Sequence, residues 1–204
     1  MLTCCLTNDK YLLSGIIIAG GKALRMNGLD KGLVLLNKQP MITRVINHFS
    51  HHCDEIIISA NRHLDDYQQW QYAVYPDIDF IDCGPLAGLY QCLLHTNHPY
   101  ILISPCDTPY LPQNYADKLF QALCQSSADV AISQYQGRLQ YAHFLIKNHL
   151  TKQIKSYLEA GNRSLKGWHE QQPFIVVDFK TQPHDFKNIN SLTALQRLSE
   201  NTSA

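Results

Sequence analysis

The chain has 204 residues, and its 17 Lys and Arg residues balance 17 Asp and Glu residues, so the formal net charge is zero. This length predicts about one to one and a half domains, and a hydrophobic content of 45% excludes a disordered chain. A zero net charge excludes a global field that would attract nucleic acid or an anionic membrane. We therefore expect no nucleic-acid partner, and we expect any anion binding to be local.

Seven cysteines are scattered along the chain without a C-x-x-C pair. Their odd number and spacing argue against a disulfide framework or a zinc knuckle, so we expect small buried thiols in a reducing compartment. The first residues, MLTCCLTNDK, are too short and polar for a signal peptide, and no apolar run approaches membrane-spanning length. These features predict a cytoplasmic protein without a membrane partner.

Apolar runs predict a series of strands. A first buried strand is expected at 16–18, followed by a short strand or arm at 33–36 and a turn at 37–40. Further strands are expected at 55–59, 73–75, 100–104, 130–132, 143–146 and 174–177, with a hairpin turn at 134–140.

Apolar residues at helical spacing predict helices between these strands. They are expected at 41–49, 64–70, 85–94, 112–123, 148–158 and 192–198. Pro112 and Asn148 are expected to open two of them, and Gly161 to end the second of these two. The alternation predicts one α/β domain with a mixed sheet at 14–200, after an N-terminal extension at 1–13.

The stretch from Gly15 to Lys31 is typical of a phosphate-binding loop. Gly20 and Gly21 follow the first strand closely, and without a Cβ atom their N–H groups can face an anion. Cations at 22, 25 and 31 add positive charge. Open α/β sheets bind their ligands at the carboxyl ends of strands, where this loop would lie.

The loop differs from two common phosphate-binding motifs. Lys22 is followed by Ala23, so the hydroxyl of a G-x-x-x-x-G-K-[ST] loop is missing, and no G-x-G-x-x-G opens a helix. A glycine turn with surface cations is the alternative interpretation. Arg25-Met26 and Asp30-Lys31 favour a nucleotide-binding loop instead.

Polar residues also follow other predicted strands. Asp107 comes directly after an apolar strand, where a hard oxygen ligand suits Mg²⁺ bound to substrate phosphates; a turn aspartate between two prolines is the alternative. Asn61 and Asp77 follow two further strands. Gly84 and Gly88 would let a flat ligand lie against a helix start, although a simple helix-start signal explains them too.

Five stretches together resemble the molybdenum cofactor guanylyltransferase family: IIIAGGKALRMNGLDKGL, IIISANR, CGPLAG, SPCDTPYLP, and the tail pair YLEAGNRSL with FKNINS. Their order and spacing match the family over nearly the whole chain. The resemblance implies a single Rossmann-like three-layer nucleotidyltransferase domain with a mostly parallel mixed sheet. It also implies Mg²⁺-dependent transfer of GMP from GTP to the terminal phosphate of molybdopterin, with release of pyrophosphate, in the cytoplasm.

The resemblance also implies roles for individual residues. It implies catalytic roles for three residues: Lys31 would bind the GTP phosphates, Asp107 would bind GTP and Mg²⁺, and Arg25 would contact the leaving phosphates. GTP contacts are implied for Ile18, Ala19, Gly20, Gly21, Lys31, Ser59, Asn61, Asp77, Gly84 and Asp107. Asn188 and Asn190 lie in the segment that the family uses on the pterin side. The family often has asparagine at the position of Ser59, and a His-Pro pair where this chain has 140–143.

Several alternatives stay open from the sequence. A sister enzyme, such as a molybdopterin cytidylyltransferase or a sugar-phosphate nucleotidyltransferase, would use the same loop with a different base pocket. A nucleotide-binding regulator would not need Asp107, and a purely structural domain would not need polar residues at successive strand ends. The acceptor that reads guanine is either Asp77 or a backbone carbonyl near Gly84, and Asp77 can instead meet the ribose. The molybdenum-insertion protein is an expected partner.

Overall fold

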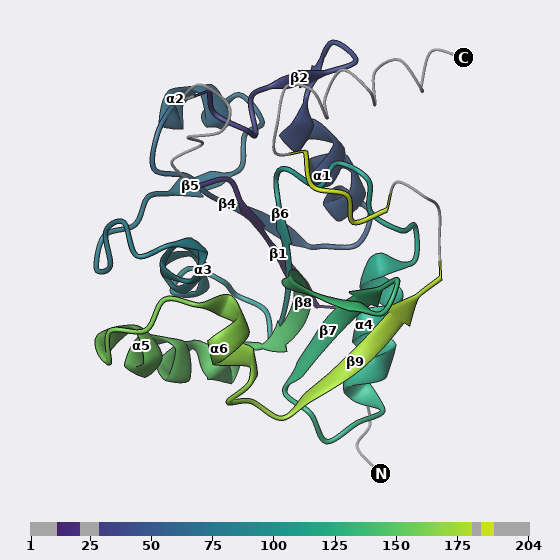
Figure 1. Ribbon diagram of the computed structural model, residues 1–204. Coiled ribbons are helices and arrows are strands. Elements are labelled where there is room, and N and C mark those ends of the chain that lie inside the picture. Colours follow the sequence, from purple (N-terminus) through teal and green to yellow (C-terminus); the bar gives the residue numbers. More distant parts are fainter. Residues whose placement is uncertain (1–11, 21–28, 181–184, 190–204) are drawn as a thin grey trace.

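A seven-stranded sheet forms the middle of the molecule in the computed structural model, which describes residues 12–20, 29–180 and 185–189 (Figure 1). The strand order is β5-β4-β1-β6-β8-β7-β9, and β8 alone runs antiparallel to its two neighbours. The strands are β1 Leu13–Ile18, β4 Glu55–Ser59, β5 Ala73–Tyr75, β6 Tyr100–Pro105, β7 Val130–Tyr135, β8 Arg138–Lys147 and β9 Phe174–Phe179. A separate small ribbon pairs β2 Leu35–Leu36 with β3 Gln39–Pro40.

Helices cover both faces of this sheet, which confirms the predicted α/β fold with a mostly parallel mixed sheet. The helices are α1 Met41–Ser50, α2 Leu64–Gln68, α3 Pro85–Leu93, α4 Tyr115–Cys124, α5 Thr151–Glu159 and α6 Leu165–His169, and η2 Asn148–Leu150 is a 3₁₀ turn. One buried cluster joins the sheet to α1, α2 and α4, and a second joins it to α3, α5 and α6. Figure 1 shows these two helical layers on opposite sides of the sheet.

Strand β1 is central because both of its faces are apolar. Leu13 and Ile17 face the cluster of α1 and α4, whereas Ile16 and Ile18 face the cluster of α3 and α5. A strand buried on both faces is expected to be largely apolar. Ser14 is the polar exception in β1; it is fully buried, and its hydroxyl donates to Oε1 of Glu55. Gly15 interrupts the run because α1 packs closely there: a Cβ atom on Gly15 would lie 2.5 Å from Cδ2 of Phe49.

We expect Gly15→Ala to lower the free energy of unfolding by about 1–3 kcal/mol, because the added methyl overpacks the interface between β1 and α1. Urea unfolding followed by circular dichroism measures the change. Phe49→Leu removes the clashing ring atoms, so adding it to Gly15→Ala is expected to cost less than the two single changes summed. A Gly15→Ala protein as stable as the parent would contradict this view of the packing.

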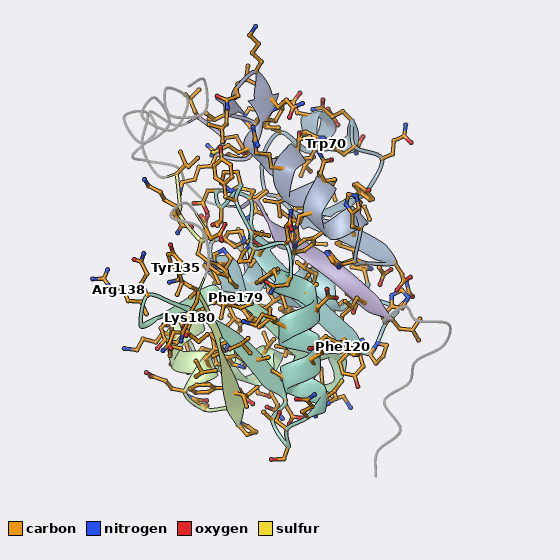
Figure 2. All side chains as sticks on the ribbon, turned by 90° about the vertical axis from the view of Figure 1, so that its right-hand side faces the viewer. Trp70, Phe120, Tyr135, Arg138, Phe179 and Lys180 are labelled. Atoms are coloured by element: carbon orange, nitrogen blue, oxygen red, sulfur yellow. The ribbon has the colours of Figure 1, made fainter. Side chains whose placement is uncertain are left out.

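The β7–β8 hairpin is longer than predicted. Residues 134–140 were expected to form the turn, but Gln134 pairs with Leu139 and Tyr135 with Arg138. Only two residues, Gln136 and Gly137, remain in the loop, and both have positive φ (49° and 73°). Two such residues match the twist of the flanking strands, which lets the ladder continue to the loop. Figure 2 shows Arg138 extending outward from this hairpin.

Further boundaries differ from the predictions. The strand expected at 33–36 covers only Leu35–Leu36, the turn expected at 37–40 contains β3, and the helix expected at 64–70 ends at Gln68. Leu13, expected in the N-terminal extension, is the first residue of β1 and is fully buried. Pro112 accepts a hydrogen bond from the backbone of Tyr115 in a turn, and α4 begins only at Tyr115. Asn148 lies in the 3₁₀ turn and accepts from the hydroxyl of Thr151 instead of capping α5. The chain turns at Gly161 as predicted, with φ of 86°. The helix expected at 192–198 lies outside the described residues.

Candidate nucleotide site

The end of β1 is held between the ends of β4 and β6. The backbone N–H of Ala19 donates to the carbonyl of Ser59 at 2.8 Å, and that of Cys106 donates to the carbonyl of Ile18 at 3.0 Å. All three strands are parallel, so their carboxyl ends lie at one edge of the sheet. The residues that follow them therefore meet there, as the sequence predicted.

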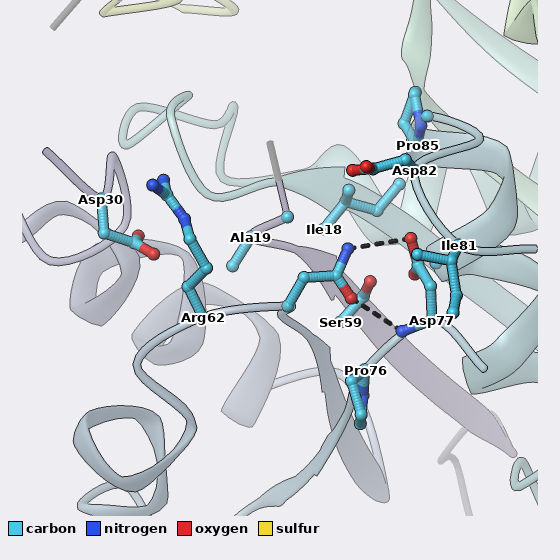
Figure 3. Close-up of a pocket in the computed structure, with 14 residues that line it drawn as sticks. Ile18, Ala19, Asp30, Ser59, Arg62, Pro76, Asp77, Ile81, Asp82 and Pro85 are labelled. Carbon is cyan, nitrogen blue, oxygen red and sulfur yellow. Dashed lines mark hydrogen bonds between the residues drawn. The ribbon is translucent and has the colours of Figure 1, made fainter. Parts of the chain in front are cut away.

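A cavity of about 620 Å³ opens at this edge (Figure 3). Its size lies within the range of small-molecule sites in proteins. Seven of the residues predicted to contact GTP line it, namely Ile18, Ala19, Gly20, Ser59, Asn61, Asp77 and Gly84. The cavity thus brings together residues from the ends of β1, β4 and β5 and from the start of α3.

Asn61 and Asp77 form a reciprocal pair on the cavity wall. The amide nitrogen of Asn61 donates to Oδ2 of Asp77 at 2.8 Å, and the backbone N–H of Asp77 donates to Oδ1 of Asn61 at 2.7 Å (dashed lines in Figure 3). The other carboxylate oxygen, Oδ1 of Asp77, is buried and accepts no hydrogen bond within the described part of the chain. Burial raises the pKa of the Asp77 carboxyl, the Asn61 hydrogen bond opposes this rise, and the charge of Asp82 adds to it.

The two glycines at the start of α3 are required for different structural reasons. Gly84 precedes Pro85, which occupies the first helical position, and has φ of 82°. A residue with a side chain rarely adopts this backbone conformation. Gly88 faces β4: a Cβ atom there would lie 2.1 Å from Oγ of Ser59 and 3.2 Å from Oδ1 of Asp77. The small residue lets α3 approach the polar wall of the cavity closely.

Lys31 and Asp107, predicted to act on phosphates and metal, form an ion pair. Nζ of Lys31 lies 3.0 Å from Oδ2 of Asp107, although the two residues are 76 positions apart in the sequence. The side chain of Asp107 is 11% exposed and that of Lys31 29%. Neither lines the 620 Å³ cavity, but Asp30, next to Lys31, does. The ion pair therefore lies beside the Asp30 end of the cavity.

The loop that carries Asp107 is fixed by a segment near the C-terminus. The backbone N–H of Ile189 donates to the carbonyl of Asp107 at 2.9 Å, and the hydroxyl of Thr108 donates to Oδ1 of Asn188 at 2.5 Å. Thr108 is fully buried. Asn188, predicted on the pterin side, thus lies beside the Asp107 loop and bonds to it.

Comparisons with known proteins agree with this arrangement. A family model described as a MobA-like NTP transferase domain matches residues 15–173. A protein of Shewanella frigidimarina named molybdenum cofactor guanylyltransferase is 41% identical over 187 residues, which cover 92% of this chain and 95% of the relative. The chain belongs to the molybdenum cofactor guanylyltransferase family.

Other members and a solved structure are also similar to the chain. A family member of Shewanella piezotolerans, with the same name, is 37% identical over 92% of each chain. The crystal structure of molybdopterin-guanine dinucleotide biosynthesis protein A from Archaeoglobus fulgidus superimposes with a TM-score of 0.77, covering 93% of this chain and 98% of the other. Its sequence is 16% identical, so this structural similarity supports the fold.

Some residues implied by the family fall outside the described part of the chain, and some cavity residues were missed. Gly21, Arg25 and Asn190 lie outside the described residues. The missed lining residues include Asp30, Arg62, Ile81 and Asp82. Arg62 and Asp30 lie toward one end of the cavity in Figure 3, and Asp77, Ile81 and Asp82 toward the other.

A signal for some of these missed residues was present in the sequence. Arg62 directly follows Asn61, and Asp30 directly precedes Lys31, so each could have been included with its neighbour. Ile81 is an apolar side chain that is 71% exposed, and Ile78 in the same loop is 60% exposed. Within the described ranges, no helix is long and apolar enough to cross a membrane.

Proposed function

We propose that this chain transfers GMP from GTP to the terminal phosphate of molybdopterin, forming the guanine dinucleotide cofactor and releasing pyrophosphate. The observation that carries the proposal is a nucleoside-sized cavity whose Asp30 end adjoins the Lys31–Asp107 ion pair. A base and ribose fit the cavity, and the pair offers one cation and one carboxylate to a triphosphate. The family relationship supports GTP and molybdopterin as the two substrates.

The two ends of the cavity differ in chemistry, which orients the proposed nucleotide. Arg62 and Asp30 lie at the end near Lys31, and this end suits the phosphates. Asp77 and the exposed Ile81 lie at the opposite end, which suits a base with hydrogen-bond donors and an apolar face. Ala19 lies between these ends, and its backbone N–H already donates to the carbonyl of Ser59. The N–H of Gly20, the next residue, can therefore donate to the α-phosphate.

We propose that Asp77 is the acceptor that reads guanine. The Watson–Crick edge of guanine presents two adjacent donors, N1–H and the 2-amino group, and a carboxylate can accept both. Asp77 lines the cavity, so its carboxylate can meet donors of a bound base. Asn61 orients Asp77 by donating one hydrogen bond to its carboxylate and accepting one from its backbone N–H. This arrangement favours Asp77 over a backbone carbonyl near Gly84.

The donor set at Asp107 fits a magnesium ion that is shared with substrate. Mg²⁺ in phosphate-transfer sites is held by one or two carboxylates together with phosphate oxygens and water. The described residues contain no cluster of three or more His, Cys, Asp or Glu side chains that could hold a metal alone. We therefore propose Asp107 as the protein ligand, and when bound Mg²⁺ would neutralise charge on the triphosphate.

The proposed reaction needs positioning more than acid–base chemistry. A phosphate oxygen of molybdopterin, already ionised at neutral pH, forms a bond to the α-phosphorus of GTP. The bond between this phosphorus and the oxygen that bridges to the β-phosphate breaks. The electron pair leaves with pyrophosphate. Lys31 and the loop N–H groups stabilise the growing negative charge. His143 is not required as a base, because burial lowers its pKa to about 3 and it packs against Phe186.

Calorimetric titration with GTP, ATP, CTP and UTP, with and without Mg²⁺, tests the proposed function. We expect selective binding of GTP that is strengthened by Mg²⁺, followed by pyrophosphate release when molybdopterin is added. A preference for CTP would keep the fold and the metal site but move the function to a cytidylyltransferase. Absence of binding by all four nucleotides would overturn the assignment of the cavity as a nucleotide site.

We also propose a cytoplasmic location and contact with the molybdenum-insertion protein, both supported by the family relationship. Such contact would protect a labile pterin during its transfer. Chemical cross-linking of the two purified proteins, with and without molybdopterin, tests the contact. No cross-linked product in either condition would contradict it.

A further inference from the structure

Tyr67 on α2 is buried next to Lys31 although it lies far from it in the sequence. Its side chain is fully buried, and its hydroxyl donates to Oδ1 of Asp30. The backbone N–H of Gly32 donates to the same oxygen at 3.1 Å. The phenol of Tyr67 and the backbone after Lys31 therefore share one carboxylate oxygen.

Asp30 also fixes the turn through its own backbone. Its carbonyl accepts hydrogen bonds from the N–H groups of Leu33 and Val34, each at 3.1 Å. Gly32 lies against the phenol so closely that a Cβ atom there would be 2.4 Å from the hydroxyl oxygen of Tyr67. Tyr67 thus contacts the residues on both sides of Lys31.

The hydroxyl of Tyr67 stays a donor at all ordinary pH values. Burial is the main cause that raises the pKa of this phenol far above its usual value, and the hydrogen bond to Asp30 contributes. The ring itself packs in the core near Trp70, with centroids 6.0 Å apart. Tyr67→Phe therefore removes the hydrogen bond of the hydroxyl and keeps the packing of the ring.

We propose that Tyr67 is a positioning residue for the phosphate end of the nucleotide site. Its hydroxyl holds Asp30, and Asp30 holds the turn that presents Nζ of Lys31 to Asp107 at 3.0 Å. The inference rests on the proposed phosphate-binding role of Lys31. The segment 61–67 would then orient residues at both ends of the site. Asn61 orients Asp77 at one end, and Tyr67 orients Lys31 at the other.

Calorimetric titration of Tyr67→Phe with GTP and separately with guanosine tests this role. Guanosine carries the base and ribose without phosphates, so loss of Lys31 positioning does not affect it. We expect about tenfold weaker binding of GTP, the size of one lost charge-assisted hydrogen bond, and unchanged binding of guanosine. Equal losses for both ligands would indicate a merely structural role and overturn the proposal.

Tyr115→Phe is the matched control. Tyr115 is also a fully buried tyrosine in the same cluster, and its hydroxyl donates to the carbonyl of Ile103 at 2.6 Å, away from Lys31. We expect this variant to bind both ligands like the parent. Should Tyr67→Phe fail to fold, Asp30→Ala removes the same link from the acceptor side and is expected to weaken GTP binding at least as much.

A double-mutant cycle with Lys31→Ala separates the inference from the function on which it rests. If Tyr67 acts through Lys31, adding Tyr67→Phe to Lys31→Ala weakens GTP binding no further. Additive losses would overturn the role of Tyr67 and leave that of Lys31 intact. Parental GTP binding by Lys31→Ala would overturn both the phosphate role of Lys31 and the positioning role of Tyr67.

Discussion

Asp107→Asn is expected to lower the turnover number for GMP transfer by about 10²- to 10³-fold, the loss typical for removal of one group that stabilises charge in a transition state. The amide removes the negative charge that pairs with Lys31 and the oxygen charge that a hard cation requires. Pyrophosphate release at saturating GTP and molybdopterin measures the change. The same assay over a Mg²⁺ series is expected to show that the variant needs more Mg²⁺ for its residual activity.

The matched control for this change is Asp129→Asn. Asp129 forms an ion pair of the same kind, with Nζ of Lys147 at 2.9 Å, but it precedes β7 and does not line the cavity. Its loss removes a partly exposed salt bridge, which typically contributes about 0–1 kcal/mol to stability, and leaves the site intact. We expect full turnover for Asp129→Asn. Parental turnover in a folded Asp107→Asn protein would exclude Asp107 from the reaction.

The strands that carry the site could be predicted from the sequence because their signal is local. Residues 16–18 and 56–58 are apolar on both faces, which only a central parallel strand buries fully. Parallel strands end at one edge of the sheet, so Ala19, Asn61 and Asp107 had to lie near one another once the alternation was recognised. The position of the cavity at this edge of the sheet follows from the topology.

The contacts between these residues could not be predicted, because they depend on distances across the fold. No local pattern pairs Tyr67 with Asp30 or places Gly88 against Ser59. The predicted hairpin boundary was wrong because Gln136 adopts positive φ next to Gly137. Residues other than glycine rarely adopt positive φ, so the sequence did not indicate a two-residue turn. Sequence spacing locates the site, whereas packing decides which side chain orients which.

Asp77→Asn is expected to remove the preference for guanine. A hydrogen bond to a charged group contributes about 1.5–3 kcal/mol, so loss of the carboxylate predicts roughly 10- to 100-fold weaker GTP binding. ITP provides the sharper comparison, because its base keeps N1–H but lacks the 2-amino group. We expect the parent to bind GTP more tightly than ITP, and Asp77→Asn to bind the two alike when both are titrated by calorimetry.

Asp79→Asn serves as the control for this loop. Asp79 lies two residues after Asp77, is exposed, and does not line the cavity. Its replacement changes the net charge by the same amount without touching the Asn61–Asp77 pair. We expect parental selectivity for GTP over ITP. Retention of that selectivity in Asp77→Asn as well would move the guanine acceptor to the backbone near Gly84.

The pH dependence of guanosine binding gives an independent test of Asp77, because guanosine has no phosphate that titrates near neutrality. Burial, the largest cause, raises the pKa of the Asp77 carboxyl, so it protonates at a higher pH than an ordinary aspartate, whose pKa is about 4. The ionised form is the acceptor, so affinity is present above this raised pKa and is lost as the pH falls through it. Asp77→Asn is expected to bind weakly and without this pH dependence, since its amide does not titrate. A parental pH profile that stays flat through the acid range would show that no carboxylate meets the base.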